Sequence, residues 1–273
     1  MCQTAHSHGR IWLLTSFAMS VHPVGERFGV SIRSAIAGAV PDRAFAALMR
    51  AVYPRVEVEL ARIGSWAPRG GTALDVGAWY GPWTARLTGL ADRVVAIEPN
   101  PVLAQLVRAR FPAATIVEAA ASDHAGSAEL WFPRGGRGAE GVASLEHRDG
   151  RSVMVRRVTI DSLGLTDVRF VKMDIEGHEA AALHGAEQTI RRDSPLLLVE
   201  LEARHQRIQD VVGLLDGWGY RGEVMPDDSW VPLDTFDLAA HQRANAHVAE
   251  RGMLGRLVRP RDRYVNLVLF RRD

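Results

Sequence analysis

The sequence lacks several features that mark particular classes of protein. It has one cysteine, Cys2, among 273 residues, which excludes an internal disulfide and a zinc site built from several cysteines. Its 33 basic residues nearly balance its 32 acidic ones, so it has no overall positive charge with which to bind nucleic acid or an anionic membrane. From these absences we expect a protein of the reducing cytoplasm that does not act on nucleic acid.

Long apolar runs are also missing. The segment 11–21 (IWLLTSFAMSV) is far shorter than the roughly 20 residues that a membrane-spanning helix needs. The residues that end it and follow it, Val21-His22-Pro23, make a poor cleavage site for a signal peptide. We therefore expect a packed or frayed N-terminal segment and no membrane span.

Lysine is nearly absent. Of the 33 basic residues 32 are arginines, and the single lysine is Lys172. An ammonium group is compact, whereas a guanidinium group is planar and broad. Lysine at this one position therefore indicates a place where a guanidinium would not fit.

What remains is the composition of an ordinary globular protein, with 47% hydrophobic and 24% charged residues. Residues up to about 67 predict helices interrupted by Pro41 and Pro54, with Asp42 as an N-cap. From Gly71 onward, short strands alternate with helices. The expected strands are 72–76, 93–97, 114–117, 128–132, 153–159, 170–173, 195–201, 220–225 and 264–270. The expected helices are 81–90, 101–110, 177–191 and 205–218.

This alternation predicts an α/β fold with a doubly wound, mostly parallel sheet. We expect an N-terminal helical extension, residues 1–68, followed by one α/β domain, residues 69–273. Residues 226–262 give no clear pattern.

A glycine turn follows the first strand. The strand 72–76 (TALDV) runs into GAWYG, where Gly77 would let the backbone approach a ligand and Gly81 would let the next helix pack closely. Glu98 ends the second strand, about 20 residues after Asp75, a position from which an acid accepts hydrogen bonds from a ribose diol. Together these features predict a nucleotide-type ligand.

The spacing favours S-adenosylmethionine (SAM) over NAD. A dinucleotide fingerprint reads G-x-G-x-x-G, whereas here three residues separate Gly77 from Gly81, and Tyr80 stands where a phosphate needs open backbone. Asp75 beside the turn would repel phosphate and suit a sulfonium. An NAD-linked oxidoreductase on the same sheet stays as an alternative.

A second set of polar residues surrounds the strand 170–173. Alternation along a strand places Lys172, Asp174 and Glu176 on one face. Ligands of open α/β sheets bind beyond the carboxyl ends of strands, where Asp174, Glu176 and His178 lie. The next strand adds Glu200 and Glu202, and His205 follows. Several acids at one rim are costly unless they bind a cation, share protons or position a substrate.

Six segments together resemble the FkbM family of class I SAM-dependent O-methyltransferases. They are ALDVGAWYG (73–81), AIEPNP (96–101), AAASDHAG (119–126), VTIDSL (158–163), FVKMDIEGHEAAALHGA (170–186) and LLLVELE (196–202). The most specific part is KMDIEGHE, and the resemblance covers about half of the chain. It implies a Rossmann-like methyltransferase fold, SAM as the methyl donor, and a hydroxyl acceptor, often on a sugar or a polyketide.

The resemblance also implies site residues. Carried onto this sequence, the cofactor-binding residues are Asp75, Gly77, Ala78, Tyr80, Gly81, Glu98, Pro99, Ala120, Ala121, Ser122 and Asp174. The segment from Asp174 to Glu179 matches the active-site rim. With the neighbouring Lys172 and Glu200, the expected catalytic residues are Lys172, Asp174, Glu176, His178 and Glu200.

Two mechanisms fit these residues. In one, His178 or Asp174 is a general base that takes the acceptor's proton. In the other, Asp174 and Glu200 hold a divalent metal such as Mg²⁺. We expect a small-molecule acceptor, either a sugar or oligosaccharide or else a polyketide or other natural product. A SAM-binding module without activity is a further alternative.

Other parts of the chain suggest roles around the acceptor. Trp131, Trp218 and Trp230 could stack on sugar rings, although we expect at least two of them to be ordinary packing residues. The Arg134–Gly138 loop could close over the acceptor. The N-terminal extension and the tail beyond about residue 226 could shape the acceptor pocket or form a homodimer contact.

Overall fold

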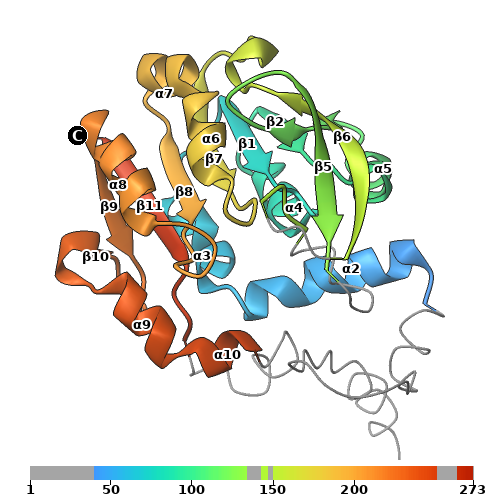
Figure 1. Cartoon of the computed structure of the whole chain (residues 1–273). Helices are drawn as coiled ribbons and strands as arrows, with labels where there is room; N and C mark the ends of the chain where they lie inside the picture. The colour runs from blue at the N-terminus through green and yellow to red at the C-terminus, as the bar shows by residue number, and fades with distance from the viewer. Residues whose placement is uncertain (1–39, 134–142, 147–149, 251–262, 273) are drawn as a thin grey trace, which may run out of the picture.

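The computed structural model describes residues 40–133, 143–146, 150–250 and 263–272 (Figure 1). Cys2, the segment 11–21 and the Arg134–Gly138 loop lie outside these residues. Within the described ranges, no helix combines the length and the apolar character needed to cross a membrane. The main element is an eight-stranded sheet with the strand order β10-β9-β11-β8-β7-β1-β2-β3.

Seven of the eight strands of this sheet overlap predicted strands, and β10 was not predicted. The strands are β1 (Thr72–Val76), β2 (Arg93–Ile97), β3 (Thr115–Val117), β7 (Val168–Met173), β8 (Leu196–Glu200), β9 (Tyr220–Val224), β10 (Val231–Pro232) and β11 (Leu267–Arg272). Five of them, from β3 to β8, pair in parallel. β11 is antiparallel to both β8 and β9 and lies between them. The predicted doubly wound, mostly parallel sheet is therefore confirmed.

The winding of the sheet reverses at β1. This strand pairs in parallel with β2 on one side and with β7 on the other, so the sheet is built outward from it in both directions. The register places Asp75 of β1 beside Lys172 of β7. Beyond the carboxyl ends of the strands at such a switch point lies the usual ligand crevice of an open α/β sheet.

Helices cover both faces of the sheet (Figure 1). One face packs against α3 (Val58–Trp66), α4 (Pro82–Leu87) and α5 (Pro101–Arg110), and the other against α6 (Glu179–His184), α7 (Glu187–Asp193) and α8 (Ile208–Gly217). Alternation divides each strand between two cores: Ala73 packs with α3 and α4, whereas Leu74 packs with α6 to α8. By the same alternation Asp75, Lys172 and Glu200 stand on the face that α3 and α4 cover.

A separate small sheet has the order β4-β6-β5. Its strands are β4 (Ala120–Ala121), β5 (Gly126–Phe132) and β6 (Arg151–Val158). β5 and β6 pair antiparallel from Gly126↔Arg157 to Phe132↔Arg151. The sequence predicted these two longer strands but not that they form a sheet of their own, because their pairing partners cannot be read from periodicity.

The predicted helix 177–191 is wrong, since α6 and α7 replace it. Asp161 accounts for the break. Its backbone N–H donates to the carbonyl of Gly185 (2.9 Å), and its carboxylate accepts from the N–H groups of Gln188 (3.1 Å) and Thr189 (2.8 Å). The carboxylate thus satisfies the N–H groups at the start of a new helix.

The segment before β1 is helical, as predicted. It contains α2 (Asp42–Val52), η1 (Tyr53–Arg55) and α3. Asp42 does not cap α2, because Pro41 occupies the cap position and Asp42 is the first helical residue, where its charge favours the helix dipole. Phe45 of α2 packs with Tyr80 and Leu103, which joins this segment to the loop after β1 and to α5.

The remaining elements of the described residues are two 3₁₀-helices and two short α-helices. They are η3 (Asp161–Leu163), η4 (Leu233–Thr235), α9 (Leu238–Ala244) and α10 (Ala246–Glu250). The last three fall within residues 226–262, for which no clear pattern was found. Gln242 of α9 donates to the carbonyl of Leu201 (2.6 Å), so α9 is fastened beside the end of β8.

Candidate functional site

A cavity of about 250 Å³ lies at the carboxyl ends of the parallel strands. Its walls come from the loop after β1, the ends of β2, β7 and β8, and the residues that precede β11. The predicted residues that line it are Gly77, Ala78, Glu98, Pro99, Ala120, Ala121, Lys172, Asp174, Glu176, His178 and Glu200. The structure therefore gathers most of the predicted site residues around one space.

Four predicted cofactor residues lie behind this wall rather than in it. Asp75 and Ser122 are fully buried, and Tyr80 packs edge-on against Phe45 at 5.2 Å. Gly81 faces another way, since a Cβ there would lie 2.9 Å from the ring of Phe111. These residues shape the loop after β1 and its supports.

Gly77 is needed for a different reason from the one expected. Its φ is +80°, and a Cβ at this position would lie 1.9 Å from the carbonyl oxygen of Asp174. The loops after β1 and β7 therefore approach each other closely enough to exclude any side chain. The glycine brings two walls of the cavity together.

Glu98 ties the loop after β1 to the loop after β2. Its Oε2 accepts from the backbone N–H of Trp79 (2.7 Å), and its Oε1 accepts from that of Asn100 (2.8 Å). Trp79 has a φ of +51°, a strained value for a bulky residue, which this bond helps to hold. Burial raises the pKa of Glu98 to about 7. Each carboxylate oxygen can accept a second hydrogen bond, so Glu98 can still bind a hydroxyl in the cavity.

Lys172 lies between two aspartates. Its Nζ is 3.2 Å from Asp174 Oδ2, 3.9 Å from Asp75 Oδ1 and 3.1 Å from the carbonyl oxygen of Gly77, to which it donates. Burial disfavours the ammonium, but the two carboxylates outweigh it and raise the pKa of Lys172. The charge of Asp75 thus faces Lys172, and Thr84 donates to its Oδ2 (2.5 Å), rather than facing a cofactor as the sequence suggested.

Asp174 and Glu200 form a carboxyl pair. Burial opposes ionisation of Asp174, but Lys172 and a hydrogen bond from Glu200 outweigh it, and the pKa of Asp174 is lowered. Burial raises the pKa of Glu200 well above its ordinary value, and the Asp174 charge adds to the rise. The two shifts run in opposite directions, so a proton shared by the pair is held by Glu200 and Asp174 is the ionised partner.

Glu176 and Glu179 differ in role. Glu176, at a φ of +53°, meets His205 Nδ1 at 2.8 Å, and burial raises the pKa of Glu176 to about 8. Glu179 does not line the cavity. Its carboxylate accepts from the N–H groups of Ile175 (2.9 Å) and Gly177 (3.0 Å), so it braces the turn that carries Asp174 and Glu176.

His178 has both ring nitrogens engaged. Nε2 lies 3.0 Å from Ser122 Oγ, and Nδ1 lies 2.7 Å from Glu146 Oε1. Ser122 in turn donates to Asp123 (3.0 Å). Both ring nitrogens are thus occupied by protein partners, and a general base needs a free lone pair facing the acceptor.

Several cavity residues were missed by sequence reasoning. Asn266, just before β11, donates through Nδ2 to Glu200 Oε1 and to Glu202 Oε1 (3.4 Å). The Tyr264 hydroxyl donates to Glu202 Oε2 (2.7 Å). The other missed residues that line the cavity include Tyr53, Glu57 and Arg204. Tyr264 and Asn266 are brought to the cavity by the insertion of β11 next to β8, which the sequence does not reveal.

The tryptophans proposed as sugar platforms do not line this cavity. Trp218 is buried in the core, and Trp230 packs edge-on against Trp66 at 5.6 Å. Trp131 lies in β5. The aromatic residues that do line the cavity are Tyr53, Trp79 and Trp83, and the indole N–H of Trp83 donates to Glu57 (2.7 Å).

Comparison with family models matches residues 71–221, more than half of the chain, to the methyltransferase FkbM domain. No protein of curated function matches the sequence. Among solved structures, methyltransferase FkbM from Methylobacillus flagellatus KT is similar, with 22% identity and a TM-score of 0.42. The match covers 57% of this chain but 40% of that one, so the chain spans less than half of that protein's length.

Two further structures are similar over most of their length. A TehB-like SAM-dependent methyltransferase from Corynebacterium glutamicum ATCC 13032 is 15% identical, with a TM-score of 0.45 and coverage of 84% of this chain and 97% of that chain. SMU.1697c from Streptococcus mutans, solved with S-adenosylhomocysteine (SAH), is 8% identical, with a TM-score of 0.42 and coverage of 80% and 96%.

The family match and the cavity concern the same part of the chain. Residues 71–221 contain the loop after β1, Glu98, the KMDIEGHE segment and the end of β8, which together form most of the cavity wall. The Rossmann-like fold expected from the sequence is the one observed. The chain therefore belongs to the FkbM family of SAM-dependent methyltransferases.

Proposed function

We propose that this methyltransferase transfers the methyl group of SAM to a hydroxyl of a polar small molecule, a sugar or an oligosaccharide. One observation carries the proposal. The lining of the cavity combines the glycine loop and Glu98 with the carboxyl groups of Asp174, Glu200 and Glu202. The glycine loop and Glu98 suit a nucleoside, and the other carboxyl groups suit a molecule rich in hydroxyl groups.

The cofactor half would use backbone and one carboxylate. Glu98 would accept hydrogen bonds from the ribose diol while it keeps its bonds to Trp79 and Asn100. Ala120 and Ala121 would line the adenine, and Gly77 and Ala78 would lie along the methionine part. Asp75, Tyr80, Gly81 and Ser122 would support these groups from behind.

The acceptor half would use Asp174 as the proton acceptor. Lys172 keeps this carboxylate ionised, and Glu200 donates a hydrogen bond to it, so a lone pair of Asp174 is available to orient a hydroxyl. The hydroxyl oxygen attacks the methyl carbon, and the sulfonium leaves as a neutral thioether. As the new C–O bond forms, the hydroxyl becomes strongly acidic, so even a carboxylate of lowered pKa can take its proton.

The preference for a sugar rests on the remaining wall. Carboxylates, the Tyr264 hydroxyl and the Asn266 amide offer many hydrogen-bonding atoms, and Tyr53 and Trp79 offer flat apolar faces. A polyketide, the alternative acceptor, would present far fewer hydroxyl groups to this wall. His178, held by Ser122 and Glu146, would position the segment after Asp174 and not act as the base.

A divalent metal is a second candidate, favoured by one observation. Ligand oxygens of Asp174, Glu176 and Glu200 lie within 4.8 Å of one another, and hard oxygen donors suit Mg²⁺. Each donor already has a protein partner, namely Lys172, His205 and Asn266 respectively. A metal here would have to compete with the Lys172 ammonium, which favours the base mechanism. A rise in the melting temperature of EDTA-treated protein on adding Mg²⁺ would support the metal.

The proposal is tested with Asp174→Asn. We expect loss of methyl transfer from radiolabelled SAM by roughly 100-fold or more, because the proton acceptor is gone. SAH should still raise the melting temperature, since ligand at 100 times its Kd adds about 2.7 kcal/mol of stability. Asp167→Asn, which changes an exposed aspartate at the other end of the sheet, is the matched control and should keep full activity. Activity that survives in Asp174→Asn would refute the assigned base.

The same assays separate the other classes. Binding of SAH without methyl transfer to any sugar or polyketide would indicate a SAM-binding module without activity. A melting shift with NAD and none with SAH would favour an oxidoreductase and would contradict the cofactor half of the proposal.

A further inference from the structure

A second cavity adjoins the first. It has a volume of about 230 Å³ and lies between residues 54–61, at η1 and the start of α3, and residues 263–266, which precede β11. None of the motifs discussed above lies in either segment. The second cavity therefore has no role in the function proposed so far.

Three residues line both cavities: Glu57, Tyr264 and Asn266. In the first cavity Tyr264 and Asn266 contact the carboxyl groups of Glu200 and Glu202. Glu57, the third shared residue, accepts from the indole N–H of Trp83 (2.7 Å). Two of the three shared residues therefore join the second cavity to the carboxyl groups of Glu200 and Glu202, where the acceptor would bind. A molecule that extends into it would be the acceptor and not the cofactor.

The size of the first cavity also indicates that part of the acceptor lies outside it. At about 250 Å³ it lies below the range of roughly 300–1,000 Å³ that is usual for ligand pockets. A nucleoside cofactor would occupy most of it and would leave room for little more than the reacting part of an acceptor. The adjoining 230 Å³ offers space for the rest.

The lining of the second cavity indicates the chemistry of its ligand. It presents three carboxylates, of Glu57, Glu59 and Asp228, and two guanidinium groups. Both guanidinium groups donate to backbone: Arg263 to the carbonyl oxygens of Met225 (2.8 Å) and Asp227 (2.6 Å), and Arg55 to that of Ala51 (2.9 Å). Asp228 meets Arg62 at 3.3 Å, and Glu57 accepts from the Trp83 indole N–H (2.7 Å). A carboxylate has lone pairs beyond those that such partners use, so this lining suits hydroxyl groups, which donate to carboxylates, and disfavours an anion.

We propose that the acceptor is an extended, neutral polyhydroxyl molecule, with its reactive hydroxyl at Asp174 and a further sugar-sized unit in the second cavity. This inference rests on the proposed function and adds the length and charge of the substrate to it. Tyr264 and Asn266 would be the residues that both units touch. Residues 54–61, outside the region that matches the family, would then help to determine specificity.

The test narrows the second cavity and leaves the first intact. Ala61 lines the second cavity and is exposed on α3, so Ala61→Trp should fold. Ala109→Trp places the same side chain on an exposed position of α5 that lines neither cavity and serves as the control. The kcat/KM for methyl transfer is measured with glucose, maltose, maltotriose and glucose 6-phosphate, together with the KM for SAM.

For the wild-type protein and for Ala109→Trp we expect kcat/KM to rise about tenfold or more from glucose to the longer saccharides, and to be lowest with the phosphate ester. In Ala61→Trp the gain with length should disappear while the KM for SAM stays unchanged. Equal rates with all neutral saccharides, or an equal loss on all of them in Ala61→Trp, would overturn the inference but not the proposed function. No methyl transfer to any saccharide would overturn both.

Discussion

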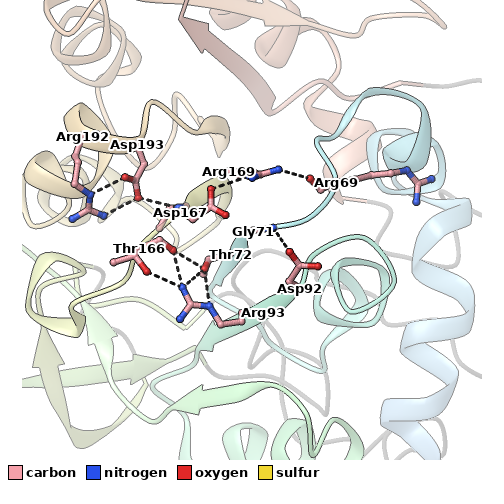
Figure 2. A network of polar contacts seen from close by, with 11 residues as sticks. Arg69, Gly71, Thr72, Asp92, Arg93, Thr166, Asp167, Arg169, Arg192 and Asp193 are labelled. Atoms are coloured by element: carbon pink, nitrogen blue, oxygen red, sulfur yellow. Dashed lines mark hydrogen bonds and ion pairs between the residues drawn. The ribbon is translucent and has the colours of Figure 1, made fainter.

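Both ends of the parallel sheet carry acidic and basic side chains, but burial and neighbouring cations affect the pKa values of the acids differently at the two ends. At the amino ends of β1, β2 and β7, arginines and aspartates pair on the surface (Figure 2). Arg169 meets Asp167 at 2.9 Å, and Arg192 meets Asp193 at 2.7 Å. The hydrogen bond from Arg192 lowers the pKa of Asp193. Asp167 and Asp193 thus each have an arginine partner.

At the carboxyl ends the acids outnumber the cations and are buried. Lys172 serves both Asp75 and Asp174, and burial raises the pKa values of Glu98, Glu176 and Glu200. Ionisation of these three glutamates is unfavourable, whereas Lys172 keeps Asp174 ionised. The difference fits the proposed placement of the chemistry at the carboxyl end.

The variant expected to have the largest effect removes Lys172, the cation that Asp75 and Asp174 share. Lys172→Met leaves Asp75 and Asp174 buried without a counter-charge, which should lower the free energy of unfolding by about 3–5 kcal/mol in urea titrations near neutral pH. In the double variant with Asp75→Asn, one orphaned charge is also removed, so part of the loss should be restored. If Lys172→Met were as stable as the wild type, the carboxyl end would not depend on its cation.

The second test concerns the contact between the two loops of the site. Gly77→Ala would bring a Cβ within 1.9 Å of the Asp174 carbonyl oxygen, in addition to the strain of a φ of +80°. Gly164→Ala is the matched control, since its φ is +60° and no atom lies within 4 Å of the added Cβ. We expect Gly164→Ala to cost about 1–2 kcal/mol, the strain alone, and Gly77→Ala clearly more. Equal losses in thermal unfolding would show that the loops can separate freely.

The sequence predicted those parts of the fold that depend on local signals. β1 and β2 have the predicted bounds, and α5 begins after Asn100, whose side chain accepts from Val102 N–H as a cap. The acids at the ends of β7 and β8 were predicted because one rule of parallel sheets places them there. These parts needed only neighbouring residues and a general topology.

The other parts depend on contacts between distant segments. Asp161 lies outside the predicted helix 177–191, and its hydrogen bonds divide that helix in two. Glu146 contacts His178, which is 32 residues away in the sequence. Asn266 reaches Glu200 only because β11 inserts beside β8. Neither periodicity nor spacing records such contacts, so the sequence could identify the acids of the site but not the groups that hold them.

A third test uses pH to probe the buried acid of the cofactor half. With a pKa of about 7, Glu98 is protonated below this pH and ionised above it. A ribose diol donates to the ionised form, so the affinity for SAH should rise roughly tenfold between pH 6 and pH 8. An SAH analogue that lacks the ribose hydroxyls should bind more weakly and without this rise. If calorimetric titrations show the same pH dependence for both ligands, Glu98 does not bind the diol.

The smallest effect is expected at the amino end. Arg169→Met removes the exposed ion pair with Asp167 and a hydrogen bond to the carbonyl of Arg69 (3.0 Å). Water and salt screen such a charge, and Asp167 stays hydrated when its partner is lost. The variant should therefore match the wild type in melting temperature, SAH affinity and methyl transfer at physiological salt. A loss comparable to that of Lys172→Met would contradict the comparison between the ends, because it would mean that an exposed pair and a buried cation contribute alike.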